Sequence, residues 1–294
     1  DGFNVEGHSQ AGYGLEGFKL SLIKSEDIEF EELLILSEAH GELQPSVEFA
    51  IQSALYDLSS KLDGMSMRRY INKDAKDSVK VNYYSNTLIE PFKGMVVKMK
   101  ICNTNLFDQL DLINRVNDQF RGMAKLRLDL NGSYDLPRAI RLVKMLEDYS
   151  IDYIEQPLPI DNIEDIYELS LHTDIPIAID ESINDIDSIN EFLDYQCADV
   201  FILKPMAIGG ISKIKSMIEL IRSSSKRFNI SSLLESNIGR LSYLQIASAF
   251  NSNEECGIAT DSFFKQDICE FPLPSNGIIN MNHFNGIGVN EISL

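Results

Sequence analysis

Four charged residues recur at a regular interval in the middle of the sequence. Asp129, Glu155, Asp180 and Lys204 follow one another at intervals of about 25 residues, each at the end of a short apolar run. One such interval is long enough for a strand, a helix and their loops. Because the carboxyl ends of parallel strands lie at one edge of a sheet, we expect these four side chains to meet there.

Three carboxylates brought together need something that offsets their charge. At a separation of ~4 Å and an effective dielectric constant of ~20, each pair repels by about 4 kcal/mol. Either a bound cation or shared protons must accompany them. Taken singly, each residue is more typical of a helix cap or a loop, so the prediction depends on their common register. An all-oxygen site suits Mg²⁺, and Mn²⁺ is a possible substitute. We predict that Asp129, Glu155 and Asp180 hold Mg²⁺.

The strand before Asp129 carries two lysines. In VVKMKI (96–101) the side chains alternate, so Lys98 and Lys100 share one face and the apolar residues mostly share the other. Such a pattern in isolation is typical of a solvent-exposed face. Beside a metal site that needs a base, we predict instead that both lysines face the interior, with Lys204 on the opposite wall. A lysine close to other cations loses its proton more readily and can serve as a general base.

Short apolar runs alternate with helical patterns from about residue 79 onward. Eight strands are predicted, at 79–84, 95–101, 125–131, 151–157, 176–182, 198–205, 228–236 and 255–260, with helices such as 136–149, 189–196 and 211–225 between them. This repeat favours a closed parallel barrel. An open doubly wound sheet is the alternative, although no glycine-rich phosphate turn follows the first strand. Before the repeat, the glycine-rich segment 1–24 suggests hairpin strands or loops, and 30–43 and 45–62 have helical periodicity.

Composition excludes several classes of partner. The net charge of −19 argues against nucleic acid and against an anionic membrane surface. The four cysteines (102, 197, 256 and 269) have no metal-binding spacing and are expected to be reduced. No apolar run approaches ~18 residues and no signal peptide is evident, so a cytoplasmic location is expected. A Mg²⁺ ion flanked by lysines suits removal of a proton next to a carboxylate, so the predicted partner is a small-molecule carboxylate. The oligomeric state stays open.

The motifs KMK (98–100), DLN (129–131), IEQP (154–157), DES (180–182) and LKP (203–205) occur in this order. Together they resemble the muconate-lactonising subgroup of the enolase superfamily over nearly the whole barrel. The resemblance implies an α/β fold, a (β/α)7β TIM-type barrel with an α+β capping domain built from the N-terminal segment and the C-terminal tail. It assigns residues 1–78 to a shortened cap, 79–262 to the barrel and 263–294 to a segment that returns to the cap.

Residue roles follow from the same resemblance. Lys100 would be the acid/base catalyst, Lys204 would stabilise an enediolate across the substrate, and Lys98 would orient the pair. Asp129, Glu155 and Asp180 would hold Mg²⁺, with Asn131 and Glu181 in support. The implied chemistry is removal of a proton alpha to a carboxylate, with the Mg²⁺ ion stabilising the enediolate.

The segment SSLLESNIG (231–239) resembles the seventh-strand motif of o-succinylbenzoate synthases. This implies a lyase that converts 2-succinyl-6-hydroxy-2,4-cyclohexadiene-1-carboxylate to o-succinylbenzoate by syn-dehydration, in menaquinone biosynthesis. The expected substrate contacts are Ser232, Glu235, Ser236 and Gly209. The first three also suit a polar strand end, and Gly209 also suits a plain turn.

Other functions are compatible with these residues. An N-acylamino acid racemase or a dipeptide epimerase would use Lys100 and Lys204 as opposed bases, and a cycloisomerase belongs to the same superfamily. Against an epimerase, the DxD pair expected after the eighth strand is reduced to Asp261. A different class, a Schiff-base aldolase, would use Lys204 as a nucleophile and leave the three carboxylates unexplained. A metal-binding protein without catalysis is the remaining alternative.

Overall fold

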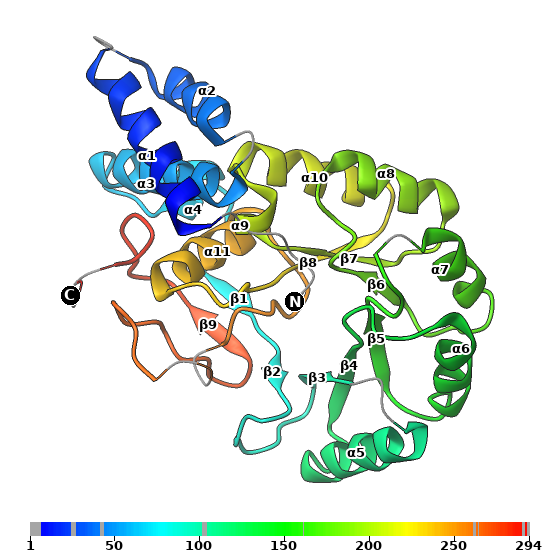
Figure 1. The fold of residues 1–294 in the computed structure, drawn as a ribbon. Coiled ribbons are helices and arrows are strands. Elements are labelled where there is room, and N and C mark those ends of the chain that lie inside the picture. The colour runs from blue at the N-terminus through cyan, green and yellow to red at the C-terminus, as the bar shows by residue number, and fades with distance from the viewer. Residues whose placement is uncertain are drawn as a thin grey trace.

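Seven parallel strands form a curled sheet at the centre of the protein, in the order β2-β3-β4-β5-β6-β7-β8. The computed structural model describes residues 7–24, 28–41, 44–101, 105–160, 162–260, 263, 265–289 and 292. The strands are β2 Tyr83–Tyr84, β3 Met95–Lys100, β4 Ala124–Asp129, β5 Ile151–Glu155, β6 Ile177–Ile179, β7 Val200–Leu203 and β8 Arg227–Ile230. Figure 1 shows helices on the outer side of this sheet. The predicted TIM-type barrel architecture is confirmed.

The helices between the strands follow apolar periodicity. They are α5 Leu106–Gln119, α6 Leu136–Met145, α7 Ile163–Ser170, α8 Ile186–Tyr195, α9 Pro205–Ile208, α10 Ile211–Ser223 and α11 Asn237–Ala249. Asp135 and Asp185 begin α6 and α8 with carboxylates that accept backbone N–H hydrogen bonds. The inward faces pack on the sheet through fully buried residues such as Ile113, Leu142 and Ile214.

The barrel closes without a regular eighth strand. In the described residues, the segment predicted as a strand at 255–260 makes only single parallel bridges, from Cys256 to Val81 and from Gly257 to Ser231. These bridges join the two ends of the curled sheet. The prediction of strand 79–84 was also partly wrong, because Ser78–Lys80 (β1) pairs with Ile278–Asn280 (β9) in a separate two-stranded sheet.

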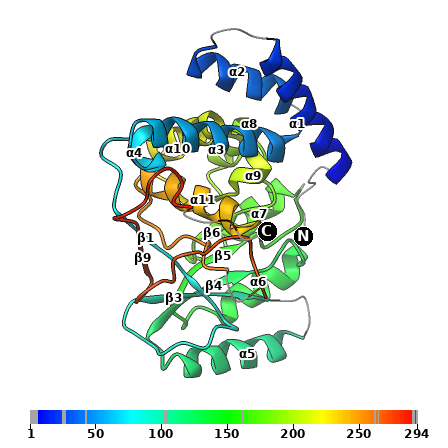
Figure 2. The same cartoon turned by 90° about the vertical axis from the view of Figure 1, so that its left-hand side faces the viewer.

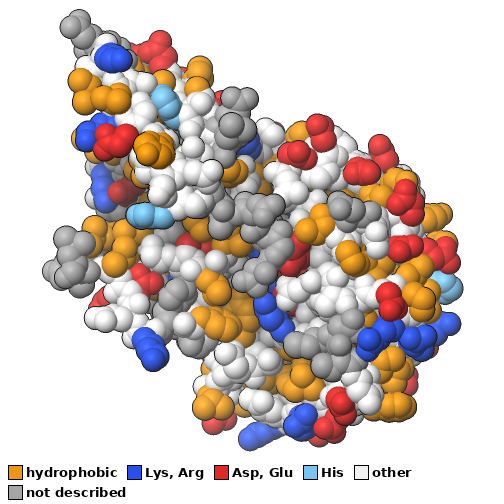
Figure 3. Space-filling view, in the orientation of Figure 1, with side chains coloured by type: hydrophobic (Ala, Val, Ile, Leu, Met, Phe, Trp, Pro, Cys, Tyr) orange, Lys and Arg blue, Asp and Glu red, His pale blue; other side chains and the backbone are white. Residues whose placement is uncertain are grey.

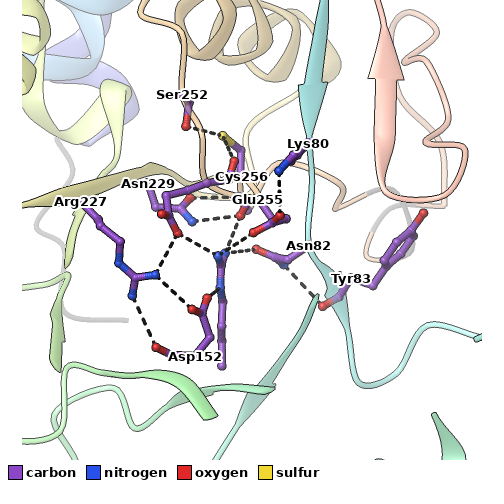
Figure 4. Close-up of polar contacts among 12 residues, drawn as sticks. Lys80, Asn82, Tyr83, Asp152, Arg227, Asn229, Ser252, Glu255 and Cys256 are labelled. Carbon is purple, nitrogen blue, oxygen red and sulfur yellow. Dashed lines mark hydrogen bonds and ion pairs between the residues drawn. The ribbon is translucent and has the colours of Figure 1, made fainter. Parts of the chain in front are cut away.

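A buried arginine ties the closing segment to the strands, within the polar cluster around Asp152, Arg227 and Glu255 that Figure 4 shows. Arg127 has no exposed surface, and its guanidinium lies 2.7 Å from the Asp152 carboxylate and 3.3 Å from those of Glu254 and Glu255. It also donates to the Glu255 carbonyl. Arg227 contacts the same acids, Asp152 at 3.1 Å and Glu254 at 3.5 Å. Charge pairing therefore adds side-chain links at this seam to the backbone hydrogen bonds that join Cys256 and Gly257 to the neighbouring strands.

Four helices gather at one end of the molecule (Figures 1 and 2). They are α1 His8–Ile23, α2 Phe30–Gly41, α3 Pro45–Leu62 and α4 Met67–Ile71. The α3 helix packs against α9 and α10 of the barrel. The C-terminal segment returns to this end, where Gly286 exchanges backbone hydrogen bonds with Met65 and Met67. The boundaries given for the three domains stay a prediction.

The expectation of strands or loops in segment 1–24 was wrong where the structure describes it. Residues 8–23 form the α1 helix, and its glycines serve packing rather than turns. A Cβ on Gly14 would overlap the Gln44 side chain, and one on Gly17 would press on His40 of α2. Phe18 of the same helix face packs on Val47 and Ile51 of α3. The glycines allow this close helix packing.

Two further expectations from the sequence concern the cysteines and membrane-spanning helices. Among the described cysteines, Cys197 and Cys256 are buried and Cys269 is partly exposed, each with a free thiol; Cys102 lies outside the described residues. In the part of the chain that the structure covers, no helix has the length and apolar character needed to cross a membrane.

Replacing Arg127 with methionine is expected to lower the free energy of unfolding by about 3 kcal/mol, because it leaves the Asp152 carboxylate buried with a lost partner. Urea denaturation measures the change. The control is Arg115→Met, which removes an exposed pair with Asp111 and should change stability by no more than ~0.5 kcal/mol. Equal effects of the two substitutions would contradict a role for Arg127 in closing the barrel.

Candidate active site

The predicted site residues lie at the carboxyl end of the curled sheet. Lys100 is aligned with Asp129, and Asp129 with Glu155, on three neighbouring strands. A cavity of about 350 Å³ opens at this end, and Lys98, Lys100, Asp129, Asn131, Glu181 and Lys204 line it. Glu155 and Asp180 are fully buried. Figure 3 shows basic side chains near the middle of this face with acidic ones close by.

Lys98 joins two of the carboxylates. Its ammonium group lies 2.9 Å from Asp129 Oδ2 and 2.6 Å from Glu155 Oε1. Burial lowers the pKa of Lys98, but the two carboxylates outweigh burial and hold the pKa well above its usual value. The two carboxylates therefore favour the ammonium form of Lys98, which neutralises and orients them.

The carboxylates respond differently to their surroundings. Burial raises the pKa of Glu155 to about 8, and the Asp129 charge adds to this shift. Burial would also raise the pKa of Asp129, but Lys98 outweighs it and the pKa is lowered. Burial raises the pKa of Asp180, although Lys204 lies 2.6 Å from its Oδ2 and opposes the shift. The three acids are thus close enough to perturb one another and the lysines.

The donor chemistry of this trio fits a hard divalent cation. In the described part of the chain, no three His, Cys, Asp or Glu side chains already have the spacing of metal ligands. Lysine ammonium groups contact the three carboxylates. Two oxygens, Glu155 Oε2 and Asp180 Oδ1, are buried and have no hydrogen-bond partner among the residues that the structure describes. Buried oxygens without partners are costly, and Mg²⁺ coordination would satisfy them.

Two amide side chains brace the acids. Asn131 donates from Nδ2 to Glu181 Oε1 at 2.9 Å, and its backbone N–H donates to Asp129 Oδ1. The fully buried Gln156 accepts hydrogen bonds from the backbone N–H groups of Asp180 and Ser182 and donates to the Ser182 hydroxyl. The sequence analysis assigned a supporting role to Asn131 and none to Gln156. The signal for Gln156 was its place in IEQP, directly after a predicted ligand.

The four predicted substrate contacts lie in three different places. Ser232 lines the cavity with Lys100 and Lys204. Glu235 and Ser236 instead line a second cavity of about 500 Å³ behind the loop. Gly209 lies outside both, because it packs against the Glu48 side chain of α3, and a Cβ there would overlap the carboxylate. The structure therefore brings only Ser232 of this set to the site.

The sequence analysis missed the apolar side of the cavity. Tyr84 and Phe263 meet edge to face with ring centroids 5.2 Å apart, and both line the cavity. Leu233 and Leu234 line it as well. Aromatic and aliphatic residues at strand ends are common in cores, so no sequence pattern distinguished these four. Asp261, used in the argument against an epimerase, lies outside the described residues.

Comparisons with known proteins identify one family for most of the chain. Residues 93–291 match the family model described as Enolase C-terminal domain-like. The o-succinylbenzoate synthase of Thermobifida fusca (strain YX) is 27% identical over 186 residues, 62% of this chain and 57% of that protein. The o-succinylbenzoate synthase of Mycobacterium leprae (strain TN) is 30% identical over 185 residues, 62% of this chain and 53% of that protein. The matched region spans little more than half the length of these relatives.

Solved structures share the fold at lower identity. The L-Ala-D/L-Glu epimerase from Bacillus subtilis superimposes with a TM-score of 0.84 at 20% identity, covering 98% of this chain and 84% of that chain. Muconate lactonizing enzyme from Pseudomonas putida gives a TM-score of 0.80 at 20% identity, covering 90% and 77%. Likeness at this identity establishes the architecture alone.

Replacing Gln156 with methionine is expected to lower the free energy of unfolding by about 2 kcal/mol. The change leaves two buried backbone N–H groups and the Ser182 hydroxyl without that partner, while keeping side-chain length. Urea denaturation would be compared with Gln119→Met at the exposed end of α5, which should change little. If both variants behave alike, Gln156 does not brace the site.

Proposed function

Since the chain belongs to the Enolase C-terminal domain-like family, we propose that it catalyses the Mg²⁺-dependent syn-dehydration of 2-succinyl-6-hydroxy-2,4-cyclohexadiene-1-carboxylate to o-succinylbenzoate. The observation that carries the proposal is one cavity lined by Lys100 and Lys204 beside the carboxylate trio. The family model and the curated relatives named o-succinylbenzoate synthase support it. A place in menaquinone biosynthesis and a cytoplasmic location are parts of the same proposal.

Lys100 is the proposed acid and base. Its neutral amine removes the proton alpha to the substrate carboxylate, and the C–H electron pair moves into the carboxylate and the ring. The same ammonium then returns the proton to the departing hydroxyl as the C–O bond breaks. Water leaves, the ring becomes aromatic, and the lysine is regenerated without any oxidant. A syn elimination needs only one such group, on one wall of the cavity.

The other charged residues have supporting parts in this scheme. Lys204 places a positive charge near the negative charge that develops during proton removal. Lys98 contacts Asp129 and Glu155 and orients them beside Lys100. When held by Asp129, Glu155 and Asp180, Mg²⁺ would stabilise negative charge on the substrate carboxylate. Asn131 and Glu181 would keep the ligands in place.

A second candidate is an N-acylamino acid racemase or dipeptide epimerase of the same superfamily, with a cycloisomerase as a related alternative. The lysines that line the cavity would then act as two opposed bases. The structural likeness to the Bacillus subtilis epimerase is compatible with this function. Exchange of an α-proton with deuterated solvent on acylated amino acids or dipeptides, without elimination, would identify it.

We expect the protein to convert the cyclohexadiene carboxylate, which is measured as the loss of its diene absorbance. Turnover should stop in EDTA and return when Mg²⁺ is added. Lys100→Ala should lower kcat by at least about 100-fold, because it removes the general base. Lys125→Ala is the control, since Lys125 is exposed on β4 and does not line the cavity.

The outcomes separate the candidates. Absence of turnover by the folded, Mg²⁺-loaded protein would rule out the dehydratase, and the deuterium-exchange assay would then decide for or against the racemase. Trapping of a carbonyl substrate on Lys204 by borohydride, with activity indifferent to EDTA, would identify the aldolase instead. Mg²⁺ binding with no turnover or exchange would indicate a metal-binding protein without catalysis.

A further inference from the structure

The loop after β8 holds a leucine in an unfavourable backbone conformation. Leu234 has φ of 65°, in the left-handed region that non-glycine residues other than Asn and Asp rarely adopt. Among the described non-glycine residues with positive φ, it is the one with an apolar side chain. Such strain is retained where the surrounding structure enforces it, and it is common at ligand sites. The question is what enforces it here and what the side chain then contacts.

Side chains of the same loop enforce the conformation. The Ser232 hydroxyl accepts the Leu234 N–H at 2.9 Å and donates to Glu235 Oε1 at 2.9 Å. Glu235 Oε2 accepts the Leu233 N–H at 2.7 Å. Glu235 is only 7% exposed, and Gly239 gives it room, since a Cβ there would overlap its side chain. The hydrogen bonds that the Ser232 and Glu235 side chains make within this loop therefore fix the turn.

The enforced turn presents an apolar side chain to the cavity. Leu234 is 51% exposed and lines the same cavity as Lys100 and Lys204. Tyr84 and Phe263 line it too, and the Tyr84 hydroxyl donates to the Gly257 carbonyl. Burial raises the pKa of Tyr84 to about 12, so its ring stays a neutral surface. The cavity therefore combines ammonium groups with aliphatic and aromatic surface.

We propose that Leu234 is a specificity-determining residue that contacts the apolar body of a carboxylate whose acid group lies at the lysines. The inference rests on the proposed function for the identity of the substrate, but binding of its product tests it separately. A carboxylate with a ring or an aliphatic chain buries apolar surface against Leu234, whereas a polar extension there loses its hydration. Ser232 and Glu235 then act as positioning residues for Leu234.

The test variant is Leu234→Asn, because asparagine tolerates the left-handed conformation and replaces an apolar surface with a polar one. Leu234→Met keeps an apolar side chain without a branch at Cβ at the same backbone position. Ser225→Asn is the matched control: Ser225 has φ of 57°, is exposed and lies outside the cavity. All variants are measured with Mg²⁺ for kcat and KM on the cyclohexadiene substrate, for Kd of o-succinylbenzoate by calorimetry, and for Tm.

Leu234→Asn is expected to raise KM and Kd about tenfold with kcat within about twofold and Tm no lower than that of the wild type. Leu234→Met should keep KM and Kd within about threefold, and Ser225→Asn should change neither. A purely structural role predicts the opposite pattern, with a lower Tm and a lower kcat in Leu234→Asn.

Three outcomes overturn the inference: KM and Kd of Leu234→Asn equal to those of the wild type, a fall in its Tm together with kcat, or no binding of o-succinylbenzoate by the wild type. Failure of the proposed function is distinguishable. A wild type that binds o-succinylbenzoate without turning over the cyclohexadiene, and loses that binding in Leu234→Asn, disproves the dehydration and supports the role of Leu234.

Discussion

Acidic side chains held together inside the barrel mouth are the constraint on which the site depends. Asp129 and Glu155 end neighbouring strands in direct register, and one buried ammonium group, that of Lys98, contacts both. The two carboxylates raise the pKa of Lys98, so its ammonium group offsets their charge. Lys100 lies two residues further along the same face and reaches the cavity with an exposed side chain. In the proposed reaction, Lys98 would offset the charge of the acids, and Lys100, the next side chain on the same face of β3, would transfer the proton.

The same alternation links the site to the closing network at the other end of the strands. Arg127 lies two residues before Asp129 on one face of β4, and Tyr153 lies two residues before Glu155 on β5. The Arg127 guanidinium stacks 4.7 Å over the Tyr153 ring. A register shift of one residue would turn Arg127 and Asp129 away from the interior together. The same register of β4 therefore serves both the charged network around Arg127 and the acids at the barrel mouth.

The strands and the charged residues at their ends could be predicted from the sequence, because buried strands appear as apolar runs that recur at a regular interval. A sequence pattern that predicts burial does not show which groups a buried residue contacts. Gly209 is buried beneath Glu48 of a distant helix, and Glu235 bonds to its own loop, so both looked like substrate contacts without being placed at the cavity. The α1 helix was missed because Gly14 and Gly17, which suggested turns, permit close helix contacts. Such pairings depend on tertiary packing, which local patterns do not encode.

The charged residues and the apolar residues of the cavity come from different parts of the sheet. The lysines and acids come from β3 to β7, where the parallel ladder is continuous. Tyr84 ends β2, and Leu233 and Leu234 follow β8, so these side chains flank the seam that is joined by single bridges. A change of side chain beside this seam leaves the register of the ligand-bearing strands untouched. In the proposed reaction, the residues that remove the proton next to the carboxylate thus come from the continuous ladder. The residues that select the group attached to that carboxylate lie beside the seam.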